Sequence, residues 1–207
     1  MFEIPDAAVP FITLQRTSVR KTVQGFYRAE ILRDYQEMKA YLPPACASVL
    51  DIGAGMAGID AMLHQHYGNG VDFYLLDRTE VSDERETPAL YGFHDATRFY
   101  SSLTVAQDLL CVNGVNSANV HLIETLDHFT ASVDMVVSLM AWGYHFPLEV
   151  YLADVARLLK LGGTLILDLR AERVSQDIET LSGHFVSWQP IGGDYKRKRY
   201  SFRKAAE

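Results

Sequence analysis

Short apolar runs typical of β-strands alternate with helical stretches along most of the chain. The strand-like runs cover residues 47–52, 71–76, 119–124, 133–139 and 164–169. Helical patterns begin near residue 58, and extend over residues 98–112 and 147–160. Because strands separated by helices pair in parallel, with the helices packed on the sheet, this order predicts an α/β fold with helices on both faces.

The two ends of the chain depart from this alternation. Apolar residues recur at steps of three and four over residues 22–42, which predicts a helix that Pro43 and Pro44 end. A further helix is predicted around residues 171–181, followed by two strand-like runs on either side of the turn sequence Gly192-Gly193-Asp194. These last two runs predict an antiparallel hairpin, so the sheet is expected to have seven strands and to be mostly parallel.

Glycine and proline residues predict where two of the helices begin and end. Pro147 is expected at the first position of the helix over 147–160, and Gly162-Gly163 is expected to close it. Asn113-Gly114 is expected to close the helix over 98–112 in the same way.

Length and composition favour one soluble domain. The chain has 207 residues, of which 48% are hydrophobic, so it can bury a single sizeable core. We predict one domain over residues 1–207, with an N-terminal helical cap (1–45) and a core that binds a cofactor (46–207). No run approaches the roughly 20 apolar residues that a membrane span needs, and the first residues do not resemble a signal peptide, so a cytoplasmic protein without a membrane partner is expected.

Charge and cysteine content narrow the function classes. The formal charge of −7 argues against a broad electrostatic contact with nucleic acid, so we expect a small-molecule substrate and no nucleic-acid partner. Cys46 and Cys111 are too few for a disulfide framework or a zinc site. His64 and His66 point in different directions on a helix, so no metal site is predicted, although Asp168 and other carboxylates could meet in space. The sequence leaves open whether the chain forms an oligomer.

The stretch VLDIGAGMAGIDAM, residues 49–62, is the strongest functional motif. It places Gly53, Gly55 and Gly58 between a strand and a helix, where backbone can approach a ligand closely and helix N–H groups point toward it. Alone, the motif is also compatible with a tight turn that holds nothing. Asp77 ends the next strand, 19 residues beyond Gly58, where a carboxylate can accept hydrogen bonds from both ribose hydroxyls of an adenosine.

Such a site suits either NAD or S-adenosylmethionine, and three features favour the second. Asp51 lies two residues before Gly53, where a carboxylate suits an amino and sulfonium cation but would repel a pyrophosphate. A helical segment of about forty-five residues precedes the glycine strand, and a hairpin follows the last parallel strand. Neither is expected of an ordinary dinucleotide-binding half-domain.

In the order and spacing of these pieces the chain resembles the class I S-adenosylmethionine-dependent methyltransferases, which have a Rossmann-like fold. The matching segments are LDIGAGMAG, YLLD, HLIETL, VDMVVSLMAWGYHF and LLKLGGTLILDLR, over roughly residues 20–205. The family usually has glycine where Ala57 stands. The resemblance implies S-adenosylmethionine as cofactor, with Asp51, Gly53 and Gly55 at its methionine end, Asp77 at the ribose and Glu124 or Thr125 at the adenine. The full set of expected cofactor contacts is Asp51, Gly53, Ala54, Gly55, Gly58, Asp77, Arg78, Glu124, Thr125 and Ser138.

The residues that would act on the acceptor of the methyl group are expected in two loops. The loop after the strand over 133–139 contains His145, a candidate general base, with Tyr144 and Trp142 expected to shape the pocket. The alternative for His145 is a packed, hydrogen-bonded core residue.

The second loop covers residues 78–102, which is longer than a connection requires. It contains a second candidate base, His94, beside Asp95, and two candidate substrate contacts, Tyr91 and Arg98. The same mixture of residues also fits a solvated flap.

The run Lys196 to Arg199 is the densest charge cluster. It predicts either a charged edge strand or a patch for a phosphorylated substrate or acidic partner.

The leading hypothesis is methyl transfer from S-adenosylmethionine to a hydroxyl of a small molecule such as a sugar. The segment SLMAWG lacks the Asn/Asp-Pro-Pro-aromatic motif of amino-group methyltransferases, which disfavours N-methylation of nucleic acid. An NAD(P)-dependent oxidoreductase and a non-catalytic, methyltransferase-like binding subunit remain the alternatives.

Overall fold

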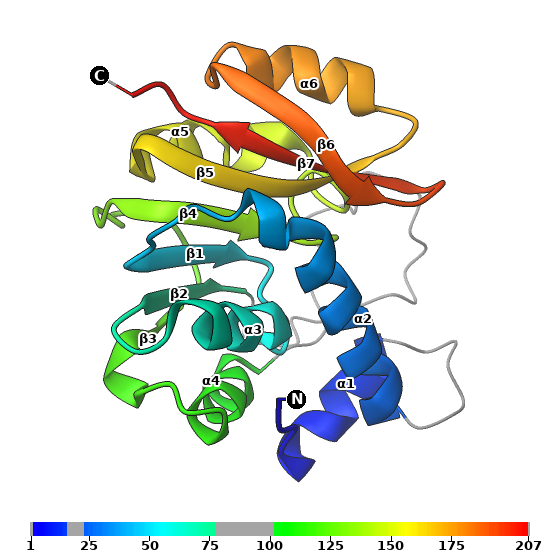
Figure 1. Ribbon diagram of the computed structural model, residues 1–207, viewed down its shortest axis with the longest axis vertical. Helices are drawn as coiled ribbons and strands as arrows, with labels where there is room; N and C mark the ends of the chain where they lie inside the picture. Colours follow the sequence, from blue (N-terminus) through cyan, green and yellow to red (C-terminus); the bar gives the residue numbers. More distant parts are fainter. Residues whose placement is uncertain (1, 16–22, 78–101, 207) are drawn as a thin grey trace.

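The computed structural model describes residues 2–15, 23–77 and 102–206 of the chain (Figure 1). They form one seven-stranded sheet in the order β3-β2-β1-β4-β5-β7-β6. Strands β1 to β5 pair in parallel, and β7 runs antiparallel to both of its neighbours. The predicted α/β fold with a mostly parallel sheet and a C-terminal antiparallel hairpin is confirmed. The strands are β1 (Ser48–Ile52), β2 (Asp72–Leu76), β3 (Val120–Ile123), β4 (Val133–Ser138), β5 (Leu159–Arg170), β6 (Ser187–Gly193) and β7 (Arg197–Arg203).

Helices cover both faces of the sheet, as predicted (Figure 1). One face packs against the N-terminal segment and the first four α-helices, through strand residues such as Val49, Phe73 and Val137. The other face packs against the last two α-helices, through residues such as Leu50 and Leu167. The α-helices are α1 (Val9–Gln15), α2 (Val23–Met38), α3 (Gly58–Tyr67), α4 (Leu103–Val112), α5 (Leu152–Leu158) and α6 (Val174–Ser182), and the short 3₁₀ turns are Asp6–Ala8, Lys39–Tyr41, Ser117–Asn119 and Leu148–Val150.

The helix expected over residues 147–160 is shorter at both ends. Pro147 precedes a 3₁₀ turn, with an extended ψ of 155°, and α5 begins only at Leu152. Gly162-Gly163 does not close this helix, because Leu159 already pairs with Val133 of β4. The two glycines lie inside β5, where Gly162 has a φ of +70°. By contrast, Gly114 follows α4 with a φ of +97°, as expected of a residue that closes a helix.

The charged run near the C-terminus does not form an edge strand. The edge position is taken by β6, and β7 lies between β5 and β6. The side chains of Arg197 and Arg199 are buried on the side of the sheet that carries α2. Both pair with Asp168 of β5, and Arg197 also donates to Asp34 of α2 at 2.9 Å. The edge-strand prediction is therefore wrong, and these two arginines are engaged in internal ion pairs.

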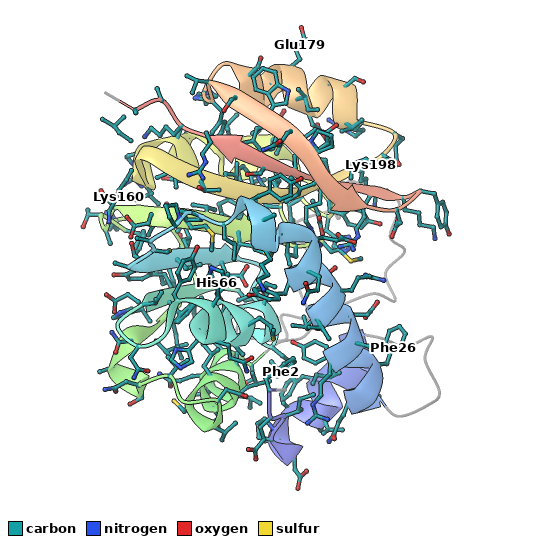
Figure 2. The ribbon with its side chains drawn as sticks, in the orientation of Figure 1. Phe2, Phe26, His66, Lys160, Glu179 and Lys198 are labelled. Atoms are coloured by element: carbon teal, nitrogen blue, oxygen red, sulfur yellow. The ribbon has the colours of Figure 1, made fainter. Side chains whose placement is uncertain are left out.

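Helix α2 packs beside α3 on one face of the sheet (Figure 1). The Tyr35 hydroxyl of α2 and His66 Nδ1 of α3 are 2.9 Å apart, and Figure 2 shows His66 on this part of the molecule. The contact joins the N-terminal helices to the helix that follows the glycine turn. No helix in the described part of the chain is long and apolar enough to cross a membrane.

Candidate functional site

The glycine turn lies where the strand order of the sheet reverses. Strand β1 is flanked by β2 on one side and β4 on the other. The connections from these strands leave in opposite directions along the sheet, so a crevice is expected at their carboxyl ends. The chain after β1 begins with Gly53, the chain after β2 begins with Asp77, and the chain after β4 begins with Leu139. The predicted cofactor residues Gly53, Asp77 and Ser138 therefore lie at the carboxyl ends of neighbouring strands.

Backbone hydrogen bonds hold the glycine turn against the end of β2. The N–H of Gly53 donates to the Leu76 carbonyl at 2.8 Å, and the N–H of Gly55 donates to Asp77 Oδ2 at 2.8 Å. Both glycines have positive φ, of 80° and 55°, which favours glycine. A Cβ on Gly53 would also overlap the Cβ of Ala141 in the loop after β4. The turn thus brings the ends of three strands into contact.

The second half of the glycine motif, with Ala57 and Gly58, differs from the structure that the sequence predicts. Ala57 precedes α3 in the left-handed conformation, with φ 52° and ψ 30°, which accounts for glycine being usual at this position in the resembling family. Gly58 is the first residue of α3, and a Cβ there would overlap the Tyr27 side chain and lie 2.9 Å from Ile31. The close approach that Gly58 permits is therefore that of helix α2. Its contact with a cofactor stays a prediction.

Two carboxyl groups are buried behind the glycine turn. Asp51 of β1 is 3% exposed, and Asp60 in the first turn of α3 is fully buried. Burial raises the pKa of Asp51 well above its usual range, and the nearby charge of Asp60 raises this pKa further. Burial likewise raises the pKa of Asp60, to about 6. Within the described residues the site therefore contains acidic groups with no paired cation, which suit a cationic ligand better than a pyrophosphate.

Ser138 at the end of β4 fixes the geometry of the crevice. Its hydroxyl donates to the Ile52 carbonyl at 2.7 Å and accepts a hydrogen bond from the Trp142 N–H at 2.9 Å. The side chain is fully buried. Ser138 thus joins β4, the end of β1 and the following loop, and its predicted contact with a cofactor stays a prediction.

The loop after β4 is compact and mostly buried. The Ala141 carbonyl accepts hydrogen bonds from the N–H groups of Tyr144, His145 and Phe146. The Trp142 ring is fully buried in the core on the α5 side, and its Nε1 donates to the Leu148 carbonyl at 3.0 Å. Trp142 therefore supports the loop from inside, and its predicted contact with a substrate stays a prediction.

Tyr144 and His145 lie together with Arg170 at the end of β5. The Tyr144 and His145 rings meet edge to face with centroids 4.9 Å apart. Arg170 Nε donates to the Tyr144 carbonyl at 2.7 Å, and its guanidinium lies 5.0 Å from the Tyr144 ring centre. Burial lowers the pKa of His145 to about 4, with a further contribution from the Arg170 charge. His145 is therefore neutral at physiological pH, whether it acts as a base or as a packed core residue.

The chain was compared with known proteins by sequence and by structure. It matches no protein-family model and no curated protein sequence. Among solved structures it is similar to ribosomal protein L11 methylase from Lactobacillus delbrueckii subsp. bulgaricus, with a TM-score of 0.59, 14% identity and coverage of 86% of this chain and 79% of that one. It is also similar to a protein from Nostoc punctiforme provisionally described as an O-methyltransferase, with a TM-score of 0.62, 14% identity and coverage of 94% and 60%.

A third similar structure is the 16S rRNA N2 G1207 methyltransferase of T. thermophilus, solved in complex with AdoMet and guanosine. Its TM-score is 0.55 at 15% identity, and the match covers 84% of this chain and 42% of that one. The chain has the class I methyltransferase fold. The resemblance inferred from the sequence motifs is confirmed at the level of the fold.

The methyltransferase fold corrects one prediction. Proteins named for ribosomal protein L11 and for 16S rRNA share it, so the exclusion of a nucleic-acid partner is wrong. That exclusion rested on the net charge of −7, which is the sum over all charged residues of the chain. A macromolecule contacts only part of the surface, so the total does not exclude a local contact.

The remaining residues of the predicted site are only partly described. Glu124 and Thr125 are exposed at the carboxyl end of β3, where the Thr125 hydroxyl accepts a hydrogen bond from the Asp127 N–H at 3.1 Å. A second set of predicted residues lies outside the described part of the chain. These are Arg78, Tyr91, His94, Asp95 and Arg98.

Sequence reasoning missed two residues of this site, Asp60 and Arg170. Asp60 could have been noticed as a carboxylate within the apolar face of the helix GIDAML, directly after the glycine turn. Arg170 ends the strand LILDLR, at the sheet edge where ligands bind in α/β folds.

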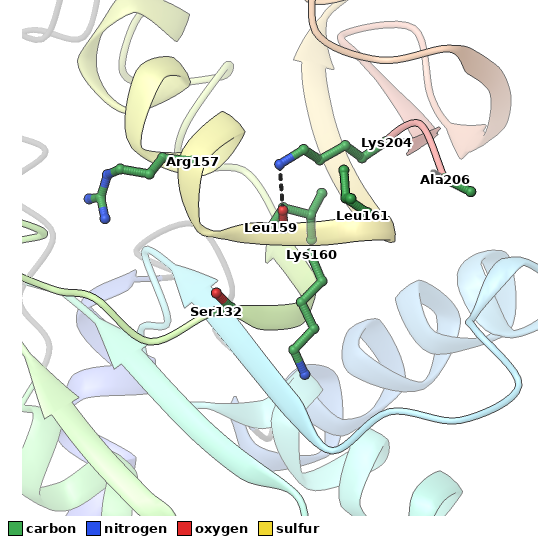
Figure 3. Close-up of a pocket in the computed structure, with 7 residues that line it drawn as sticks. All are labelled: Ser132, Arg157, Leu159, Lys160, Leu161, Lys204 and Ala206. Carbon is green, nitrogen blue, oxygen red and sulfur yellow. Dashed lines mark hydrogen bonds between the residues drawn. The ribbon is translucent and has the colours of Figure 1, made fainter.

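A hollow of about 600 Å³ lies at the other end of the strands, where β4 and β5 begin. It is lined by Ser132, Arg157, Leu159, Lys160, Leu161, Lys204 and Ala206 (Figure 3). Its cations are engaged within the protein. Lys160 pairs with Asp134 at 2.7 Å, and Lys204 donates to the carbonyls of Ala156 and Leu159 at 2.6 Å each. The hollow lies at the amino ends of β4 and β5, so it is separate from the crevice expected at the carboxyl ends of β1, β2 and β4.

Proposed function

We propose that the chain transfers a methyl group from S-adenosylmethionine, which would bind at the carboxyl ends of β1, β2 and β4. The observation that carries this proposal is the glycine turn held against Asp77, with the buried carboxyls of Asp51 and Asp60 behind it. A ligand with a ribose at one end and an ammonium group at the other matches this arrangement of acids.

Each end of the site has a distinct task in this proposal. The Asp77 carboxylate orients the ribose, since a carboxylate accepts several hydrogen bonds and can keep the one from Gly55. The acidic pair behind the turn attracts the amino group of the methionine end. When bound, the cofactor supplies an electrophilic methyl group at the mouth of the crevice.

We further propose that the acceptor is a hydroxyl of a small molecule such as a sugar. The end of β4 and the loop after it have Ser138-Leu139-Met140-Ala141 in place of an amide and prolines that would hold an amino group. His145 in the same loop is neutral, so it can accept a hydrogen bond from a hydroxyl. An oxygen becomes strongly acidic as it gains a methyl group, so even a weak base can take its proton late in the reaction.

The cofactor is tested by calorimetric titration with S-adenosylhomocysteine and with NAD. We expect binding of the first alone. Asp77→Asn should weaken it by about tenfold to a hundredfold, as expected for loss of a charge-assisted hydrogen bond. Asp72→Asn is the matched control, because Asp72 lies at the other end of β2 and pairs with His121. Binding of NAD alone would favour the oxidoreductase alternative and contradict the proposal.

The acceptor is tested by incorporation of a labelled methyl group. The panel contains sugars, phenols, small amines, an rRNA fragment and a ribosomal protein extract. Incorporation into a hydroxyl compound is the expected result. Incorporation into RNA or protein would overturn the small-molecule proposal while leaving methyl transfer intact, and no incorporation by an enzyme that binds the cofactor would favour a binding subunit.

A further inference from the structure

Met140 has a strained backbone just beyond the carboxyl end of β4. Its φ is 56°, in the left-handed region that residues with a Cβ rarely adopt. Hydrogen bonds on both sides hold the backbone there. The Ser138 hydroxyl accepts from the Trp142 N–H at 2.9 Å, and the Ala141 carbonyl accepts three N–H groups. Such strain persists only where the surrounding structure imposes it, and it concentrates at binding sites.

The exposure of Met140 contrasts with that of its neighbours. Within residues 138–145, Met140 alone is exposed, at 40%, and Leu139 is half-buried. The other methionines in the described part of the chain are all buried, namely Met38, Met56, Met62 and Met135. The loop therefore keeps its polar groups inside and presents an apolar side chain to the outside.

This side chain follows the strand that borders the proposed cofactor turn. Ala141 comes directly after Met140, and a Cβ on Gly53 would overlap the Cβ of Ala141. Ligands of α/β folds bind at the carboxyl ends of the strands, and an acceptor has to approach the methyl group in line. An exposed residue between β4 and this contact is therefore placed to meet the acceptor.

The side chains at this position suit an aromatic ring better than a sugar. A thioether makes favourable contacts with aromatic rings, with the sulfur about 5 Å from the ring. A sugar carries hydroxyls around its ring, and covering them with Leu139 and Met140 would leave hydrogen bonds unmade. The nearby Ser138 hydroxyl already donates to the Ile52 carbonyl at 2.7 Å, so its proton is not available to a sugar.

The weak basicity of His145 favours the same class of acceptor. Burial lowers the pKa of this imidazole to about 4. A phenol has a pKa of about 10, and the hydroxyl of a sugar is less acidic. A weak base in this loop is therefore better matched to a phenol, whose proton is lost more easily.

We propose that the acceptor is a phenol and that Met140 is a specificity-determining residue that packs against its ring. This inference rests on the proposed function, and it narrows the acceptor from hydroxyl compounds in general to aromatic ones. In the reaction the phenolic oxygen bonds to the methyl carbon as the carbon–sulfur bond breaks, and the phenolic proton leaves to solvent.

The contact is tested by NMR on the full chain, isotopically labelled at the methionine methyl groups. The Met140 resonance is assigned by its absence in Met140→Leu. The chain is saturated with S-adenosylhomocysteine and titrated with phenol or with myo-inositol, two six-membered rings that differ in polarity. We expect phenol to give a saturable shift of Met140 and myo-inositol to give none. The buried methionines are the internal control, because phenol bound beside Met140 should move them little.

Variants test the consequence for methyl transfer to phenol. Met140→Gln keeps the length of the side chain but makes its end polar, and should lower kcat/KM about tenfold, as expected for loss of one apolar contact. Met140→Leu stays apolar and should retain most of the activity. The matched control is His128→Gln, at another exposed residue with a left-handed backbone (φ 64°), which should leave kcat/KM unchanged.

A structural role gives a different result. If Met140 only maintained the loop, Met140→Gln would lower the urea midpoint and weaken the binding of S-adenosylhomocysteine, whereas we expect both to stay unchanged. That result would overturn the inference. If Met140→Gln does not fold, the phenol titration of the wild-type chain still decides.

The failure of this inference differs from that of the proposed function. A Met140 resonance that shifts with myo-inositol and not with phenol, or with neither, would overturn the inference alone, provided that S-adenosylhomocysteine binds in the calorimetric titration. A chain that binds no S-adenosylhomocysteine would contradict the proposed function and the inference with it.

Discussion

Arg199 binds both carboxylate oxygens of Asp168 across neighbouring strands, with Nε 2.7 Å from Oδ1 and a terminal nitrogen 2.9 Å from Oδ2. Arg197 donates to the same carboxylate at 2.8 Å. Although burial opposes ionisation of both guanidinium groups, the Asp168 charge raises the pKa of each. One buried carboxylate thus offsets part of two buried positive charges.

We predict that Asp168→Asn destabilises the fold by about 3–5 kcal/mol, because it leaves two buried arginines short of negative charge. Urea unfolding measures the loss. The matched control is Asp154→Asn, which breaks a largely exposed pair with Arg157 and should cost at most about 1 kcal/mol. Asp34 and Glu37 of α2 also pair with Arg199, at 3.2 and 3.1 Å. Equal costs for the two variants would show that these two carboxylates suffice to balance the arginines.

A second prediction concerns the contact between α2 and α3. Gly58→Ala should destabilise the fold by about 1–3 kcal/mol, because the new methyl group would overlap the buried Tyr27 side chain. This cost should exceed the gain of about 1 kcal/mol in helix propensity. A double-mutant cycle with Tyr27→Phe checks the cause: the cost of Gly58→Ala should be smaller once the Tyr27 hydroxyl has been removed. An unchanged cost would place the strain elsewhere.

Glycine patterns in the sequence predicted the local structure around the turn better than they predicted the role of each glycine. The strand, turn and helix could be predicted because apolar periodicity and left-handed turn residues are local properties. The function of Gly58 depends on Tyr27, which lies thirty-one residues earlier, and no local pattern encodes that contact. The burial of Arg197 and Arg199 depends on β7 being inserted between two strands, which is also a long-range property.

The difference between local and long-range properties also applies to the two candidate general bases, His145 and His94. The position of His145 follows from the rule that loops at the carboxyl ends of parallel strands form the site. Its charge state does not follow from the rule, because its lowered pKa depends on how deeply the ring is buried and, second, on the charge of Arg170 in β5. His94 lies outside the described part of the chain, so its role stays a prediction.

Ala57 provides a third prediction. Its left-handed backbone costs about 1–2 kcal/mol relative to an ordinary conformation, which glycine would avoid. Replacing Ala57 by glycine would, however, lower the free energy of unfolding by about 0.4–1 kcal/mol, because the unfolded chain gains freedom. It would lower it by about a further 0.8 kcal/mol through the loss of one buried methyl group. Ala57→Gly should therefore change stability by less than about 1 kcal/mol. Ala57→Val, which adds bulk in the same conformation, should destabilise by about 2 kcal/mol or more in urea unfolding, and a tolerated valine would contradict the assigned backbone geometry.

The last prediction concerns the ionisation of His145. Burial, followed by the Arg170 charge, lowers its pKa to about 4. Because the unfolded chain takes up this proton near pH 6.5 and the folded chain only near pH 4, His145 should make the fold less stable as pH falls through that window. The raised pKa values of Asp51 and Asp60 act in the opposite direction, so total stability does not isolate the histidine. An NMR titration of the imidazole isolates the contribution of His145.

In that titration the wild-type His145 resonance should begin to shift only below about pH 5. Arg170→Gln should raise the pKa of His145 while leaving it below the usual value, since burial remains the larger cause. Arg157→Gln removes an equal charge near the start of β5, far from the loop, and should leave the titration unchanged. If both variants shift His145 alike, the effect is one of total charge, and Arg170 makes no specific contribution to the lowered pKa of this imidazole.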